Sequence, residues 1–267
     1  MSVSAGRSAA PHPAGAAWPA ARHIAVAIFL TAALSIWQIY SLFLPPVLLP
    51  GPARVILRFI AMWSERSFLA YAIASLVHVL ASVAISFTLG VAIALAGYFS
   101  PTLRPAIYAR LAPFLNSFSG IGWAFLALIW FGINGGAVIF ATSVALLPLV
   151  IINAGAGFAE LNGETLEMAT SFSRRSGRHV ALVILPMLFP YLFATFRLCI
   201  GIAWQIVLTA ELLCGSRGLG TVIDVARARY ATDMLFAVVL LVVIVVFVCD
   251  RLVFATLQTR LRKTYEV

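Results

Sequence analysis

In the middle of this chain of 267 residues, one stretch is densely charged and could do chemistry, residues 160–190. The run before it, residues 111–159, holds no Asp, Glu, Lys or Arg, and a second long apolar run follows it. Because charged groups are costly in a bilayer, a polar island between apolar runs of membrane length must lie in water. The stretch is therefore accessible to a soluble partner.

The local pattern within this stretch predicts a short helix, a turn and a second helix. Asn162 can cap the first helix, and Glu164 and Glu167 then lie where the helix dipole favours negative charge. Three apolar residues recur at roughly helical spacing and form a stripe on that helix: Leu166, Ala169 and Phe172. Residues 173–177 interrupt the pattern before the next helix begins.

The spacing from Glu167 to Pro186 resembles the cytoplasmic "EAA" loop of binding-protein-dependent ABC importer permeases, without a gap. Met168 stands at the middle Ala of that pattern, and Ser173 stands at its usual Gly. The resemblance implies that this segment docks in a groove of a separate ATP-binding subunit. The implied contact residues are Leu166, Glu167, Met168, Ala169, Phe172, Ser173, Gly177, Leu185 and Pro186. The alternative is a solvated loop that has no partner.

The composition indicates a polytopic membrane protein, because 63% of the residues are hydrophobic, 10% are charged and the mean hydropathy is +1.04. A formal net charge of +9 would suggest nucleic acid for a soluble protein. Here arginines that flank membrane spans explain the charge, and no nucleic-acid partner is expected. The cysteines Cys199, Cys214 and Cys249 lack metal-ligand spacing, so we expect them to be small buried residues.

The apolar runs predict an all-α fold with six membrane-spanning helices and a cytoplasmic coupling helix between the fourth and fifth spans. The predicted spans are residues 24–44, 67–100, 111–131, 137–156, 181–213 and 235–254. The predicted domain is 22–260, with cytoplasmic tails at 1–21 and 261–267. Outside the spans, residues 54–63 are amphipathic and predict a short surface helix, and residues 221–233 are expected to form an outer loop.

Small residues recur every four positions in the second predicted span, and His78 occupies the one missing position of the stripe. The small residues are Ala70, Ala74, Ser82, Ser86, Gly90 and Ala94. Small residues at this spacing allow two helices to approach closely, so the stripe should face protein. We expect His78 to make a structural hydrogen bond rather than to carry a proton or bind a ligand.

Arg197, Trp204 and Glu211 are spaced seven residues apart in the fifth predicted span and so share one helix face. Fourteen residues separate the two charges by about 21 Å, so each needs its own partner. Structural ion pairing and lining of a substrate route are both open for them. The resemblance extends to this Arg, Trp and Ala-Glu pattern and to the following turn, residues 218–220. It implies a substrate route lined by Trp123, Trp130, Arg197, Trp204 and Glu211.

Catalytic motifs are missing from the sequence. Its only lysine is Lys263, which rules out a Walker A loop, and there is no His-Glu-x-x-His or Gly-x-Ser-x-Gly motif. Catalysis by this chain is therefore not expected. The chain should bind no cofactor or metal, and a partner ATPase would bind ATP and magnesium.

The resemblance implies the permease subunit of an ABC importer, closest to the nitrate, sulfonate and taurine branch. The implied partners are cytoplasmic ATPase subunits, a periplasmic binding protein, a second copy of the chain and the lipid bilayer. Arg197 weakly favours an anionic solute. The alternative is a secondary transporter driven by an ion gradient. That class should show acidic residues near the membrane midplane, whereas Glu211 and Asp250 lie near span ends.

The distribution of basic residues predicts the orientation. If both termini are cytoplasmic, eleven of the 18 Lys and Arg residues lie inside, six lie outside, and Arg197 lies in the membrane. The excess of positive charge inside favours this topology in a bacterial inner membrane, and it places the polar island in the cytoplasm.

Overall fold

A computed structural model describes residues 19–159 and 185–254, and these residues form helices and short connections with no strand among them. Residues 1–18, 160–184 and 255–267 lie outside the described part of the chain. The tail predictions and most of the predicted coupling segment, from Leu166 to Gly177, therefore fall outside it. The described residues confirm the all-α class.

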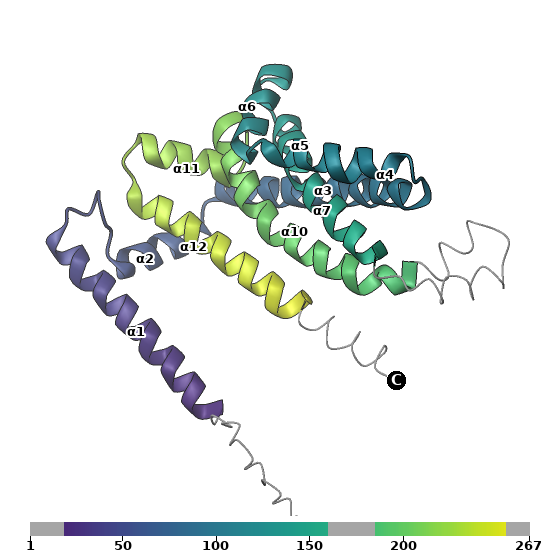
Figure 1. The fold of residues 1–267 in the computed structure, drawn as a ribbon. Helices are drawn as coiled ribbons and strands as arrows, with labels where there is room; N and C mark the ends of the chain where they lie inside the picture. The colour runs from purple at the N-terminus through teal and green to yellow at the C-terminus, as the bar shows by residue number, and fades with distance from the viewer. Residues whose placement is uncertain (1–18, 160–184, 255–267) are drawn as a thin grey trace, which may run out of the picture.

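Twelve helical elements follow one another in the described ranges (Figure 1). They are α1 (Pro19–Phe43), α2 (Pro52–Met62), α3 (Arg66–Phe99), α4 (Leu103–Ala106), η1 (Ile107–Leu111), α5 (Ala112–Ser117), α6 (Gly120–Phe131), α7 (Gly135–Ala159), α10 (Leu185–Cys214), α11 (Leu219–Ala228), α12 (Thr232–Val248) and η3 (Cys249–Phe254). Five are long and apolar enough to cross a membrane, or up to six candidates if one bent helix pair counts as a span. These five are α1, α3, α7, α10 and α12 with the start of η3.

The third predicted span, residues 111–131, is not one continuous helix. The chain there forms two segments, Leu103–Ser117 and Gly120–Phe131, which are bent by 79°. Phe118 is extended, and the Ser119 hydroxyl caps α6 by accepting the Gly122 N–H at 3.3 Å. Trp123 bridges the bend, because its Nε1 donates to the Leu115 carbonyl at 3.4 Å. This local capping outweighs the apolar continuity on which the prediction rested.

The predicted outer loop over residues 221–233 is largely helical, because α11 occupies Leu219–Ala228 and α12 already begins at Thr232. The short helix predicted over residues 54–63 is confirmed by α2. It buries Val55 and Met62 and packs against α12, so it has the expected apolar side. Two connections between long helices, α2 and α11, are thus short helices, and both pack against α12.

The core forms where α3, α7 and α10 pack together. The predicted small-residue stripe of α3 is buried against α7 from His78 to Ala94, which confirms the close approach. The Ser82 hydroxyl donates to the Ile139 carbonyl, and the Ser143 hydroxyl donates to the Ser82 carbonyl, both at 3.3 Å. These bonds join the two helix backbones through small side chains.

Helix α1 extends away from the other helices in Figure 1 and reaches them near its carboxyl-terminal end. There Trp37 lies 5.8 Å from the ring of Phe236 in α12, and its Nε1 donates to the Pro50 carbonyl at 3.1 Å. None of the most apolar window of α1 is buried within the chain. Its apolar surface must therefore face lipid or another subunit.

The close approach of α3 and α7 can be tested at Gly90. A Cβ there would lie 2.7 Å from the Cβ of Val150, so Gly90→Ala should lower the free energy of unfolding by about 1–3 kcal/mol. Gly201 is the matched control, because a Cβ at this position of α10 meets nothing within 4 Å. Gly201→Ala should stabilise by about 0.5–1 kcal/mol. Tryptophan fluorescence during thermal unfolding in detergent would measure both, and equal melting of the Gly90 variant and the unaltered chain would contradict this packing.

Candidate functional site

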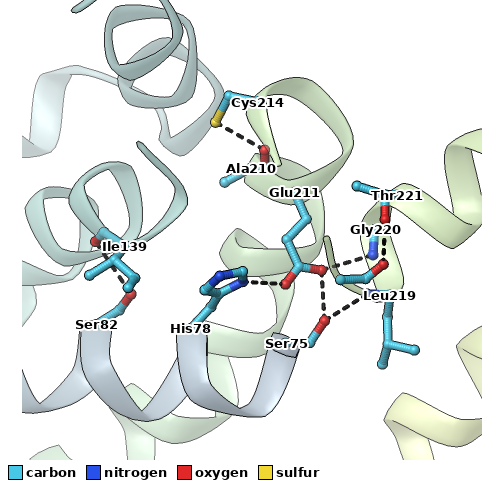
Figure 2. Close-up of polar contacts among 11 residues, drawn as sticks. Ser75, His78, Ser82, Ile139, Ala210, Glu211, Cys214, Leu219, Gly220 and Thr221 are labelled. Carbon is cyan, nitrogen blue, oxygen red and sulfur yellow. Dashed lines mark hydrogen bonds and ion pairs between the residues drawn. The ribbon is translucent and has the colours of Figure 1, made fainter. Parts of the chain in front are cut away.

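The carboxylate of Glu211 in α10 is completely buried, at 0% exposure, and it has partners in two other helices (Figure 2). Its Oε1 lies 2.8 Å from Nδ1 of His78, and its Oε2 accepts the Ser75 hydroxyl at 2.7 Å. The Gly220 backbone N–H donates to the same Oε2 at 2.9 Å. These donors replace the water that a buried carboxylate loses.

Helix α11 presents its amino-terminal end to this carboxylate. Leu219 is the first residue of the helix, and its backbone N–H donates to the Ser75 hydroxyl at 2.7 Å. The Gly220 N–H, one residue later, donates directly to Glu211. The partial positive charge at a helix amino terminus also favours an anion there. Glu211 therefore fixes α11 to both α3 and α10.

Three glycines leave the space that Glu211 fills. A Cβ on Gly218 would overlap the carboxylate itself, and Gly218 has a φ of +146°, which L side chains rarely adopt. A Cβ on Gly220 would meet the Leu208 carbonyl and the Cβ of Glu211, and one on Gly215 would meet the Glu211 backbone. The glycine-rich turn and the acidic residue before it thus form one structural unit.

The structural role expected for His78 is confirmed by its contact with Glu211 and by its low exposure of 7%. Its Nε2 faces the first residue of α7, where a Cβ on Gly135 would come within 2.6 Å. Sequence reasoning missed Ser75 as a partner. The available signal was its position one helical turn before His78, on the same face of α3.

Arg197 forms a bidentate ion pair with Asp250 of η3. Its Nε lies 2.6 Å from Oδ1 and its Nη2 lies 2.8 Å from Oδ2. The two side chains are 37% and 48% exposed, respectively. The expectation that Arg197 and Glu211 would find separate partners on other helices is confirmed, although sequence reasoning did not name Asp250 as that partner.

The residues predicted for the substrate route differ widely in exposure. Trp123, Trp204 and Glu211 are buried within the chain, at 8%, 3% and 0% exposure. Trp130 is 59% exposed, and its ring lies 5.9 Å from that of Phe140. Arg197 is partly exposed beside its acidic partner. Their part in a route stays a prediction.

Of the predicted ATPase contacts, only Leu185 and Pro186 belong to a described element, the start of α10. Among the described residues, no group of three or more His, Cys, Asp or Glu side chains could hold a metal ion. Cys199 and Cys214 are buried, as expected, and Cys249 is partly buried.

Comparison with known proteins shows what this architecture is similar to. The taurine transport system permease protein TauC of Escherichia coli is 25% identical over 91% of both chains. The bicarbonate transport system permease protein CmpB of Synechococcus elongatus is 27% identical over 62% of this chain and 60% of its own. An ABC transporter permease protein of Methanocaldococcus jannaschii is 25% identical over 82% of this chain and 84% of its own. No family model matches the chain.

These relatives are transport permeases, and they support an ABC importer permease of the nitrate, sulfonate and taurine branch. Together with the five long apolar helices, the relatives support a multi-pass inner-membrane protein that acts as a transport subunit. The relatives give no support to the alternative of a secondary transporter driven by an ion gradient. In this chain, the Ala-Glu pattern and the glycine turn that follows it meet around the carboxylate of Glu211.

The fit between Gly218 and Glu211 predicts non-additive stability. Gly218→Ala should destabilise the permease strongly, because its methyl group needs the space of the carboxylate. Glu211→Ala should cost about 1–3 kcal/mol for each buried donor left unpaired. The double variant should lose about 0.5–3 kcal/mol less than the sum of the two, because the methyl group then fills vacated space. Denaturation of all three purified variants measures the coupling.

Gly215 provides the matched control for this cycle. A Cβ there meets the backbone of Glu211, which Glu211→Ala retains. Gly215→Ala and Glu211→Ala should therefore add. Additive losses at both glycines would show that the Glu211 carboxylate does not determine the need for glycine at position 218.

The Arg197–Asp250 pair predicts a second cycle. Arg197→Gln and Asp250→Asn should each lower the melting temperature, and the double variant should melt above either one, because no charge is then left alone. Arg227→Gln is the control, since Arg227 forms an exposed pair with Asp224 and its loss should change little. Uptake measured on the same preparations separates the roles: full stability with lost uptake would assign Arg197 to the substrate route instead.

Proposed function

We propose that two copies of this chain form the membrane pathway of an ABC importer for a small organic or inorganic anion. Two cytoplasmic ATPase subunits would drive it, and a periplasmic binding protein would deliver the solute. The observation that carries the proposal is the similarity to a taurine permease over 91% of both chains. The matching spacing of the EAA-like segment between α7 and α10 supports it.

The membrane topology in this proposal has six spans and both termini in the cytoplasm. The bent pair, Leu103–Ser117 and Gly120–Phe131, supplies the sixth span in addition to the five long helices. The excess of Lys and Arg on the side of residues 160–184 supports a cytoplasmic place for that segment. The opposite side, with α2 and α11, then faces the periplasm.

The ends of α7 and α10 support a coupling role for the segment that joins them. These helices pack together, and a Cβ on Gly157 would lie 3.0 Å from the Cβ of Tyr191. A force applied to residues 160–184 would therefore reach two core helices at once. ATP-driven closure of the ATPases would move this segment and switch the membrane pathway between outward and inward access.

The anionic substrate class rests on the relatives, whose names specify taurine and bicarbonate. Arg197 adds little to this argument, because Asp250 compensates its charge. The second copy of the chain would cover exposed apolar surface such as that of α6, where Ile129 is 77% exposed and Trp130 is 59% exposed.

Reconstitution of the chain with a partner ATPase and a binding protein tests the proposal. ATP hydrolysis should rise when the binding protein carries taurine, bicarbonate or a related anion, and it should not rise with choline. Ala169→Asp should abolish the rise, because it places an unpaired charge in an apolar groove. Coupled-enzyme assay of phosphate release in proteoliposomes measures both effects.

The control is Ser171→Asp, which adds the same charge about 200° around a helix from Ala169. It should leave the stimulation near that of the unaltered complex. Normal stimulated hydrolysis and normal uptake in the Ala169 variant would contradict the coupling assignment. Failure of every tested anion to stimulate would contradict the substrate class.

A further inference from the structure

A cavity of about 460 Å³ lies at the junction of α2 and α3, helix α11 and the start of α12, and Glu211 is not among its described lining residues. Its size falls within the range of small-molecule sites, about 300–1,000 Å³. In the proposed topology it opens on the periplasmic side, where solute arrives. None of the assignments made above uses it.

The lining of this cavity combines cationic groups, hydroxyl groups and an apolar wall. Arg58 and Arg229 supply the positive charge. The hydroxyl groups come from Ser67, Tyr71, Ser216 and Thr221. Phe68, Val222 and Met234 provide apolar surface. Such a lining matches a ligand with a charged oxyanion head and a short apolar body.

The one acidic residue among the described lining residues is Glu65, and it forms a long ion pair with Arg58. The nearest pair of atoms, Nη1 and Oε1, is 3.6 Å apart, and the side chains are 35% and 46% exposed. A charge-assisted hydrogen bond is usually about 2.7–2.9 Å long. Arg58 can therefore turn towards a ligand at little cost.

Two helix amino termini lie beside the cavity, and Asp233 in the first turn of α12 offsets the partial positive charge of the second one. Helix α3 begins at Arg66 and helix α12 at Thr232, and Ser67 and Met234 from their first turns line the cavity. Neither Glu65 nor Ala231, which precede these helices, caps them with a side-chain hydrogen bond. Backbone N–H groups at such ends favour an anion. The carboxyl-terminal end of α11 carries a partial negative charge, and Arg229, the residue that follows the helix, compensates that charge.

We propose that this cavity binds a small organic oxyanion, such as an alkyl sulfonate or carboxylate, before it crosses the membrane. The oxyanion head would lie between Arg58 and Arg229, and the alkyl body would lie against Phe68 and Met234. This inference rests on the proposed function for the class of solute and for the side from which it arrives. It adds a site within one subunit.

Thiol labelling at Ser216 tests the site. A Ser216→Cys variant, with the three native cysteines changed to Ala, is reconstituted in liposomes and treated with a membrane-impermeant maleimide. Ethanesulfonate at ten times its dissociation constant should slow labelling about tenfold. Dimethyl sulfone, which is uncharged and of similar size, should not slow it. If replacement of the cysteines prevents folding, an ethanesulfonate-induced rise in melting temperature on the unaltered chain replaces this readout.

Two arginine pairs provide matched variants. Arg58→Gln with Arg229→Gln should abolish protection by ethanesulfonate. Arg54→Gln with Arg227→Gln removes equal charge from the same two helical regions, outside the cavity lining, and should retain protection. Equal loss of protection in both double variants would show that general surface charge causes the protection, and it would overturn the site.

Bilayer composition distinguishes the solute from a lipid headgroup, which also carries an oxyanion. Slower labelling in liposomes that contain phosphatidylglycerol, with no effect of ethanesulfonate, would assign the cavity to lipid and overturn the proposal. Uptake by the complete complex separates this failure from that of the proposed function. Anion uptake without protection overturns the cavity site alone, whereas protection without uptake of any anion overturns the proposed transport function alone.

Discussion

Burying a carboxylate among apolar helices costs several kcal/mol unless hydrogen-bond donors replace the water that it loses. Glu211 of α10 meets this constraint with side chains of α3 and a backbone N–H of α11. No one of these helices can provide the site alone. The position of each at this end of the bundle therefore depends on the other two.

The same constraint explains why a helix as short as α11 is held in place. It has ten residues, and a helix of that length is marginal in isolation. It buries little apolar surface, mainly through Leu219 and Ala226. Its amino-terminal N–H groups are instead paired with Ser75 and Glu211. Polar contacts and the helix dipole thus contribute here what apolar burial contributes to the longer helices.

Much of the fold follows from the sequence because bilayer thickness sets the length of an apolar run. The long helices and the small-residue face of α3 needed only hydropathy and spacing. The bend before α6 did not follow, since its cause is the capping serine Ser119 between two apolar segments. Helix α11 was missed because it is stabilised by a residue far away in the sequence, Ser75.

The candidate site, like the fold, could be predicted from the sequence only in part. Composition and depth indicated that Arg197 and Glu211 each need a partner, because a lone charge in the membrane is costly. Which partner each takes depends on how the helices pack, and the sequence gives no distances between helices. Asp250 and Ser75 were therefore identified only from the structure.

Arg197 and Glu211, the two charged residues of α10, differ in their exposure to solvent, and this difference bears on how the helix can move. Glu211 is sealed from solvent, and separating it from its partners would leave a buried charge unpaired. The Arg197–Asp250 pair is partly exposed, so water can replace either partner at lower cost. If α10 moves during transport, its Glu211 end is the fixed one and displacement grows towards Leu185, roughly 39 Å away along the helix. The larger displacement then occurs beside the segment proposed to contact the ATPase.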